Sequence, residues 1–200
     1  MLRKKIKVSD TSIWEDKMTA LEIKNYALKL CGLPSMPDTY VIDYINEALD
    51  NLAIKYDTAR KKVIIVLTGT ENEWTDLPSD CLAVKRCFKV DNNYVDDDFL
   101  IENNQIQFTD TGTYKVECLS MQEHISALTD TPAINIAYHI ALAYWVAHKE
   151  ISREFLLEDM VQGNNKVMLL QEYGVKAEEA NNALSSMKRS RKRIKYADFF

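Results

Sequence analysis

The sequence is poor in the residues from which common catalytic and metal sites are built. It has only five glycines in 200 residues, which leaves little material for a P-loop or a glycine-rich phosphate loop, and it contains no nucleophile motif. It has three histidines, and His139 and His148 lie nine positions apart rather than at the i, i+4 spacing of a helical metal pair. We therefore expect no enzyme and no cofactor, and we interpret both histidines as ordinary helix residues.

Cysteine is scarce as well, and its spacing argues against a structural metal. The four cysteines form no CxxC pair (Cys31, Cys81, Cys87 and Cys118). A site built from Cys81, Cys87 and His124 is conceivable, but reduced, buried thiols of a cytosolic product are the favoured interpretation. The acidic run Asp96-Asp97-Asp98 lacks suitably spaced partners, so we expect a solvated loop there rather than a cation site.

Long apolar runs are also absent. No stretch approaches the roughly 20 residues that a membrane-spanning helix needs, and the start of the chain lacks the apolar segment of a signal peptide. The sequence therefore predicts no membrane partner.

Charge, by contrast, is abundant and unevenly distributed. The last fourteen residues hold six basic residues and one acid, and the first eight residues hold four basic residues and no acid. The C-terminal end thus carries +5 and the N-terminal end +4. Because the whole chain has a net charge of −5, residues 9–186 carry −14. An acidic body repels nucleic acid, whereas basic ends attract an anionic surface on protein or DNA.

Helical patterns lie on both sides of a central segment. Thr19 to Glu22 matches a capping box, and Gly32 with Pro34 predicts the end of that helix. Asp38 is predicted to cap a second helix, and Thr131-Pro132 to open a third that continues to Lys149 and is central. A last helical region is predicted from near Ser152 to about Ser186, broken or bent near Gly163 or Gly174. Its predicted packing face includes Val167, Leu169, Leu170 and Tyr173.

The segment from 62 to 119 has a different pattern. It opens with a β-branched run at 63–67 and then alternates apolar and polar residues, as at Ile106 and Phe108. Turn signals separate the candidate strands: Asp91-Asn92-Asn93, Glu102-Asn103-Asn104 and Asp110-Thr111-Gly112. We expect hairpins that bury one face and expose the other.

Together these patterns predict an α+β, mainly α fold: a four-helix bundle with an inserted small antiparallel β-module and extended N- and C-terminal arms. The predicted divisions are an N-terminal arm (1–18), a helical bundle domain (19–186) with the β-insertion at 62–119, and a basic and aromatic C-terminal docking tail (187–200).

Three groups of residues, in this order, resemble the head-to-tail adaptor proteins of tailed bacteriophages. The first is a helix containing Asn46-Glu47-Ala48-Leu49, with Ala53 and Tyr56 behind it. The second is Trp74-x-Asp76-Leu77-Pro78-x-Asp80, followed at the end of the β-segment by Gly112-Thr113-Tyr114-x-Val116. The third is the alanine- and aromatic-rich helix after Pro132, followed by a long helix and a C-terminal tail.

This resemblance implies a structural virion protein that is assembled in the host cytoplasm. Members of that family form a ring, usually of twelve copies, beneath the portal protein, and they join the capsid to a tail or stopper protein. The resemblance further implies a channel through which DNA passes without specific binding. The acidic body is consistent with such a lumen, although acidic residues also serve only to keep a domain soluble.

In such proteins the C-terminal tail reaches onto the portal. The residues expected to dock here are Lys188, Arg189, Arg191, Lys192, Arg193, Lys195, Tyr196, Phe199 and Phe200. Two other roles remain open: a nucleic-acid-binding packaging factor similar in role to a small terminase subunit, and a different virion protein such as a tail-completion or stopper ring. The basic tail favours the packaging factor, but the acidic body and the lack of a convincing helix-turn-helix pair argue against it.

Overall fold

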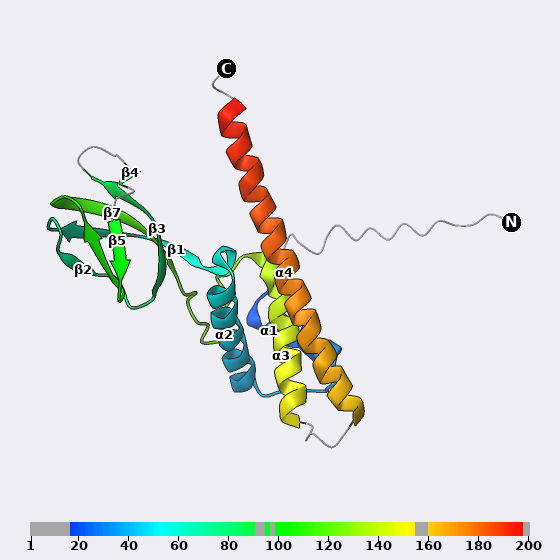
Figure 1. Ribbon diagram of the computed structural model, residues 1–200. Helices are drawn as coiled ribbons and strands as arrows, with labels where there is room; N and C mark the ends of the chain where they lie inside the picture. Colours follow the sequence, from blue (N-terminus) through cyan, green and yellow to red (C-terminus); the bar gives the residue numbers. More distant parts are fainter. Residues whose placement is uncertain (1–16, 91–94, 97–98, 155–159, 198–200) are drawn as a thin grey trace. The chain divides into compact units, whose positions relative to one another are not determined.

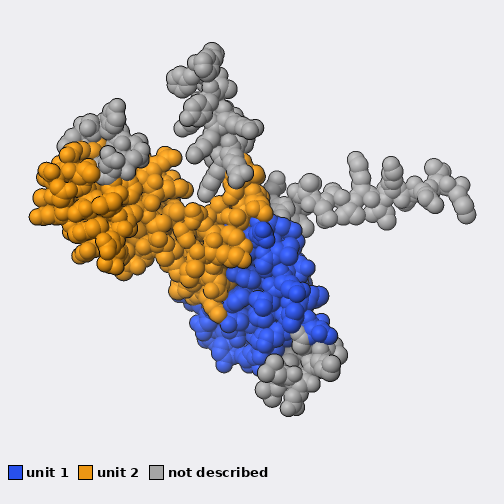
Figure 2. Space-filling model, viewed as in Figure 1, with its two compact units in different colours: residues 1–45, 125–180 blue, residues 46–124, 181–200 orange. Residues whose placement is uncertain are grey.

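The computed structural model describes residues 17–90, 95–96, 99–154 and 160–197, and it divides into two compact units (Figures 1 and 2). Unit 1 comprises residues 1–45 and 125–180, and unit 2 comprises residues 46–124 and 181–200. The described residues form four α-helices: α1 (Ala20–Cys31), α2 (Asp38–Lys55), α3 (His139–Glu154) and α4 (Met160–Ala197). Helices α2 and α4 each contribute residues to both units.

Helix α1 begins at the predicted capping box. The Thr19 hydroxyl accepts a hydrogen bond from the Glu22 N–H over 3.3 Å, and the Glu22 carboxylate accepts one from the Thr19 N–H over 2.7 Å. These bonds to Thr19 lower the pKa of the Glu22 carboxyl group. Gly32 adopts a left-handed conformation with φ of 68°, and its N–H bonds to the Leu28 carbonyl. Both predicted ends of this helix are confirmed.

The first turn of α1 also binds a distant loop. The N–H groups of Ala20 and Leu21 donate to the carbonyls of Asp130 and Leu128, over 2.8 and 2.9 Å. The Asp130 carboxylate in turn accepts from the backbone of Ser126 and Ala127, which lowers the pKa of Asp130. These hydrogen bonds hold the backbone of residues 126–130 in a loop.

The helix after this loop therefore starts later than the sequence predicts. Thr131 and Pro132 lie before a short 3₁₀ turn, η2 (Ile136–Tyr138). The Asn135 side chain caps this turn by accepting a hydrogen bond from the Ala137 N–H over 3.0 Å. Helix α3 begins only at His139. The prediction that Pro132 takes the first helical position is wrong.

The last helical region also differs from its prediction. Helix α3 continues to Glu154, and α4 runs without a break from Met160 through Gly163 and Gly174 to Ala197. The predicted break at a glycine is wrong, and so is the extended C-terminal arm. Contacts with α3 on the N-terminal side of Gly174 hold α4 in place: the Trp145 and Tyr173 rings lie 4.8 Å apart, and His148 bonds to the Lys166 carbonyl.

Unit 2 contains two antiparallel sheets, and η1 (Asp57–Ala59) precedes them. The first has the strand order β1-β7-β3-β4, and the second has the order β2-β6-β5. The strands are β1 (Lys61–Gly69), β2 (Trp74–Asp76), β3 (Cys81–Lys89), β4 (Val95–Asp96), β5 (Phe99–Glu102), β6 (Gln105–Phe108) and β7 (Gly112–Ser120). Asn103 and Asn104 have positive φ values of 49° and 61°, which suits a two-residue turn between β5 and β6. That predicted turn is confirmed.

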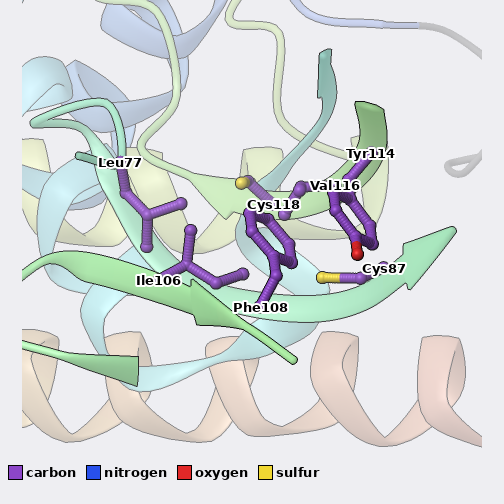
Figure 3. Packing of buried hydrophobic residues seen from close by; sticks show 7 residues of the cluster. All are labelled: Leu77, Cys87, Ile106, Phe108, Tyr114, Val116 and Cys118. Carbon is purple, nitrogen blue, oxygen red and sulfur yellow. The ribbon is translucent and has the colours of Figure 1, made fainter. Parts of the chain in front are cut away.

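The two sheets enclose a hydrophobic core of their own (Figure 3). Strands of both sheets contribute to it, and its buried members are Leu77, Cys87, Ile106, Phe108, Tyr114, Val116 and Cys118. In β1 the half-buried Ile65 and Leu67 pack against this core, and their partners in β7 are the buried Val116 and Tyr114.

These findings contradict the predicted fold class. Strands make up 26% of the chain and helices 49%, so the β-part is too large to be a small insertion in a mainly α bundle. The sheets, with the second part of α2 and the end of α4, make one compact unit; α1, α3 and the remaining parts of α2 and α4 belong to the other. The alternation of apolar and polar residues correctly predicted hairpins. It does not show whether the apolar faces of different hairpins pack together to form a core.

Candidate interaction surfaces

The structure places seven of the nine predicted docking residues, from Lys188 to Tyr196, at the end of α4. Residues 188–196 continue the helix, whereas Phe199 and Phe200 lie outside the described residues. For residues 187–197 the structure describes the backbone but not the side chains. That the nine docking side chains form one contact surface therefore stays a prediction. Residues 1–16 of the predicted N-terminal arm also lie outside it.

The three residues considered for a metal site make other contacts. Cys87 is buried in the core of unit 2, and the Cys81 thiol lies 3.7 Å from the Ala83 carbonyl. His124 lies 3.0 Å from the Asp50 carboxylate. Cys118 is buried in the core of unit 2 beside Cys81, and burial followed by the hydrogen bond with Cys81 raises the pKa of the Cys118 thiol to about 12. A thiol held protonated in this way is a poor metal ligand and a poor nucleophile. No metal-binding group occurs among the described residues; Asp97 and Asp98 are not among them.

The two helix histidines bind backbone groups of unit 1. His139 is buried, and its Nδ1 accepts a hydrogen bond from the Met18 N–H over 3.0 Å. Burial lowers the pKa of His139, so the ring is neutral with its proton on Nε2, toward the Ile134 carbonyl. His148 lies 3.0 Å from the Lys166 carbonyl of α4. These contacts join the elements of unit 1.

An ion pair within α3 contacts the start of α2. Glu150 is fully buried, and both of its oxygens bind Arg153 of the next turn, over 2.7 and 3.1 Å. The Arg153 guanidinium also lies 4.9 Å from the centre of the Tyr40 ring, which stacks on Tyr44 with centroids 6.2 Å apart. Tyr40 is 40% exposed. Tyrosine and arginine are common anchors of protein interfaces, so this group is a candidate contact surface.

The other candidate surface lies on α4. Leu169, Ala177 and Ala180 are buried, as expected for the side of α4 that packs within unit 1. Val167 and Leu170 were predicted to share that packing face, but they are exposed, together with Met168 and Val175. Sequence reasoning missed this surface because it assigned each apolar residue to one face. The missed signal is that apolar residues between 167 and 175 occur on all sides of the helix.

The comparisons with known proteins identify the family. The family model described as SU10 adaptor protein matches residues 18–195, which is nearly the whole chain. The chain belongs to this family of phage head-tail adaptors. No curated protein matches the sequence.

Family membership sets the general role of this adaptor protein. It is a structural component of the phage virion, and it interacts with head and tail components. The resemblance noted in the sequence is thereby confirmed. None of the described helices is both long enough and apolar enough to cross a membrane. The contacts described above hold the fold together, so the candidate functional sites of the adaptor are its surfaces.

Proposed function

We propose that this adaptor protein forms a homo-oligomeric ring of twelve copies beneath the portal and thereby joins the capsid to the tail. The family match carries this proposal. The charge distribution supports it, because a body of net charge −14 suits the wall of a channel that DNA must traverse without adhering. Copies of the ring would contact the portal on one side and a tail or stopper protein on the other.

The C-terminal end of α4 is the proposed portal contact. Six cations between Lys188 and Lys195 supply attraction to an acidic surface, and Tyr196, Phe199 and Phe200 supply aromatic anchors. Phosphate binding does not need such anchors, whereas a groove between protein subunits rewards each fully buried ring with roughly 1.5–3 kcal/mol. Repeated around a ring, modest docking of each copy gives strong attachment, because later copies bind at a high effective concentration.

The acidic body also bears on when the ring forms. Like charges would face one another between free copies, so the isolated chain should be monomeric or weakly associated and should assemble on the portal. A ring that appears in solution only at high salt agrees with this proposal, because salt screens the repulsion. A stable ring at physiological salt without any partner contradicts it.

Two variants test the portal contact on heads that carry the portal but lack this protein. Deleting residues 196–200 keeps every Lys and Arg and should abolish attachment without changing the unfolding of the monomer. Replacing the six cations should instead weaken attachment in a salt-dependent way. Normal attachment of the deletion variant contradicts the docking proposal. Tight binding of the full chain to duplex DNA, with a steep salt dependence that these cations control, favours the packaging-factor alternative.

A further inference from the structure

Charge is divided between the two sheets of unit 2. Strands β1, β3 and β7 of the first sheet together hold six cations and one acid, Glu117. The chain has four acids and no cation between residues 68 and 84, and six acids and no cation between residues 90 and 114. All three strands of the second sheet, β2, β6 and β5, lie within these two stretches. The two sheets therefore differ in the sign of their charge.

The outward side of the first sheet follows from the position of its core. The core residue Val116 of β7 lies between Lys115 and Glu117, so these two residues are on the outward side. Their partners in β1, Val66 and Ile64, are 62% and 67% exposed. This side of the sheet thus has two large aliphatic side chains in contact with water, next to a lysine.

A β-bulge in β3 adds two cations to the same side. Val84 and Cys87 pack in the core, and the register shifts between them. The two residues in between, Lys85 and Arg86, therefore stand together opposite Glu117, and both are exposed. We call the resulting surface the basic face, and it consists of Ile64, Val66, Lys85, Arg86, Lys115 and Glu117.

The one acid of the basic face does not neutralise its cations. Glu117 is buried and forms an ion pair with Lys62. Asp96 lies in β4 at the edge of this sheet and pairs with Cys87, on the core side of the register, and residues 97 and 98 lie outside the described residues. The cations of the face take part in no ion pair among the described residues: Lys85, Arg86 and Lys115.

The outward side of the second sheet carries the opposite charge. The buried residues of β6 alternate with two glutamines, and these with their cross-strand partners form what we call the acidic face: Trp74, Asp76, Leu100, Glu102, Gln105 and Gln107. Its apolar members, Trp74 and Leu100, are 40% and 62% exposed. Its acids, Asp76 and Glu102, are exposed as well, and the strands of this sheet contain no lysine or arginine.

The two faces point away from each other. The inward sides of both sheets share one core, in which the Phe108 ring of β6 stacks on the Tyr114 ring of β7 (Figure 3). Each copy therefore presents the basic face on one side of the core and the acidic face on the other. A contact between these unlike faces can repeat from copy to copy, as a closed ring requires.

Charge complementarity identifies the partner of these faces as a second copy. Each face combines exposed apolar side chains with charges of one sign, as protein interfaces do. Nucleic acid would use the cations of the basic face but not Ile64 and Val66, and the acidic face would repel it. A second copy offers the complement of both faces at once, with apolar side chains against apolar ones and cations against acids.

This local attraction acts against a repulsion between whole copies. Residues 9–186 carry −14, so free copies repel one another, and exposed ion pairs contribute little by themselves. On the portal, bound copies are held next to one another at a high effective concentration. The contact between the faces therefore acts chiefly there.

We propose that the basic face of one copy packs against the acidic face of the next copy in the ring, with the cations of the first face opposite Asp76 and Glu102 of the second. The apolar side chains of the two faces meet beside these charges. This inference rests on the proposed ring and adds the surfaces through which its copies meet.

Reversing the charge of either face tests the contact on heads that carry the portal but lack this protein. The basic-face variant is Lys85→Glu with Lys115→Glu, and the acidic-face variant is Asp76→Lys with Glu102→Lys. For each variant the half-saturating concentration should rise about tenfold or more, because like charges then face one another between copies. Binding should also lose its cooperative dependence on concentration.

A third variant controls for net charge. Glu178→Lys with Glu179→Lys changes the charge of the chain by the same amount as the acidic-face variant. Both residues are exposed on α4 in unit 1, outside the two faces. This control should bind at the wild-type concentration or below it, because repulsion between whole copies decreases.

Mixing the two reversed variants tests which faces meet. The basic-face variant has two negative faces and the acidic-face variant two positive ones, so an equimolar mixture can form rings in which they alternate. The mixture should regain cooperative binding near the wild-type concentration, and mass spectrometry should find equal amounts of the two variants on the heads. From a mixture of the basic-face variant with the net-charge control, heads should bind the control alone, since each basic-face variant would bring two negative faces together.

Substitution by glutamine keeps the test decisive if a reversed face impairs folding. Lys85→Gln with Lys115→Gln places no acid beside Glu117, and both lysines are exposed, so this variant should unfold at the wild-type temperature. Its half-saturating concentration should still rise, by a smaller factor than that of the basic-face variant. Binding equal to that of the wild type would overturn the inference.

Other results would overturn the inference and leave the proposed ring intact. These are unchanged cooperative binding of both reversed variants and a mixture of the two that stays defective. If the basic-face variant binds heads normally but those heads no longer accept tails, a tail protein covers the basic face instead. If the full chain binds duplex DNA and the basic-face variant does not, nucleic acid covers it. Failure of the wild type itself to bind these heads contradicts the proposed function rather than this contact.

Discussion

The rings of Phe108 and Tyr114 stack with their centroids 3.9 Å apart and their planes only 4° from parallel, although β6 and β7 belong to different sheets. Both side chains are fully buried, and the Tyr114 hydroxyl donates to the Asp110 carbonyl over 2.7 Å. This contact joins the two sheets of unit 2 through their shared core.

Gly69→Ala should destabilise unit 2. A Cβ atom at this position would overlap the buried ring of Phe108, so the ring must shift, which disturbs its stacking on Tyr114. Such overpacking costs about 1–3 kcal/mol, which thermal or denaturant unfolding measures. Gly174→Ala is the matched control, because it has open space and should leave stability equal or slightly higher. Equal stability of Gly69→Ala and the wild type would show that the core of unit 2 adapts more easily than its packing indicates.

Removing Arg153 should destabilise unit 1 more than removing its partner. Arg153→Ala leaves the fully buried Glu150 carboxylate without its counter-ion and should lower the free energy of unfolding by about 3 kcal/mol. This value is at the low end of the range for buried ion pairs, because Arg153 is partly exposed. Glu150→Gln should cost less, since the remaining guanidinium reaches water and still contacts Tyr40. The variant with both substitutions should lose less free energy of unfolding than the sum of the losses in the two single variants. Strictly additive losses would contradict an energetic coupling between these groups.

Stability should depend on pH through His139. Burial holds the pKa of His139 below its ordinary value of 6.5. Above pH 6.5 the ring is neutral in both the folded and unfolded chain, and its contribution to stability is complete. As the pH falls below 6.5, the unfolded chain takes up a proton that the folded chain does not, so the free energy of unfolding decreases until the lowered folded pKa is reached.

His139→Gln should flatten this part of the pH profile, because glutamine can accept the Met18 N–H bond but does not titrate. Urea unfolding at a series of pH values between about 7 and 5 measures the slope. Glu22 and Asp130, whose lowered pKa values start from 4.5 and 3.8, act mainly at more acid pH. An identical slope in the variant and the wild type would show that His139 is not the titrating group.

Local signals in the sequence predicted local structure well. The capping box from Thr19 to Glu22, the left-handed Gly32 and the Asn103-Asn104 turn each depend on a few neighbouring residues, and the structure contains all three. The start of α3 was mispredicted because its cause is distant. The carbonyls of Leu128 and Asp130 bind the first turn of α1, and nothing near Pro132 in the sequence reveals that contact.

The size of the β-unit and the exposed apolar residues of α4 were missed for similar reasons. Alternation at Ile106 and Phe108 shows which side of a strand is buried, but not that Phe108 meets Tyr114 of another sheet. On α4, the apolar residues Val167 and Leu170 look like packing residues until the position of the neighbouring helix is known. The family, in contrast, was predicted correctly, because the order of several weak motifs extends over most of the chain.

Imaging this protein on heads is the most direct test of the central claim that the adaptor forms a ring on the portal. Heads that carry the portal but lack the adaptor are incubated with the purified protein, and the portal vertex is reconstructed by electron cryomicroscopy. The account predicts additional density in a closed ring at that vertex alone, with equivalent copies around an open channel. Density elsewhere on the head, a single unordered copy at the vertex, or no added density would contradict it.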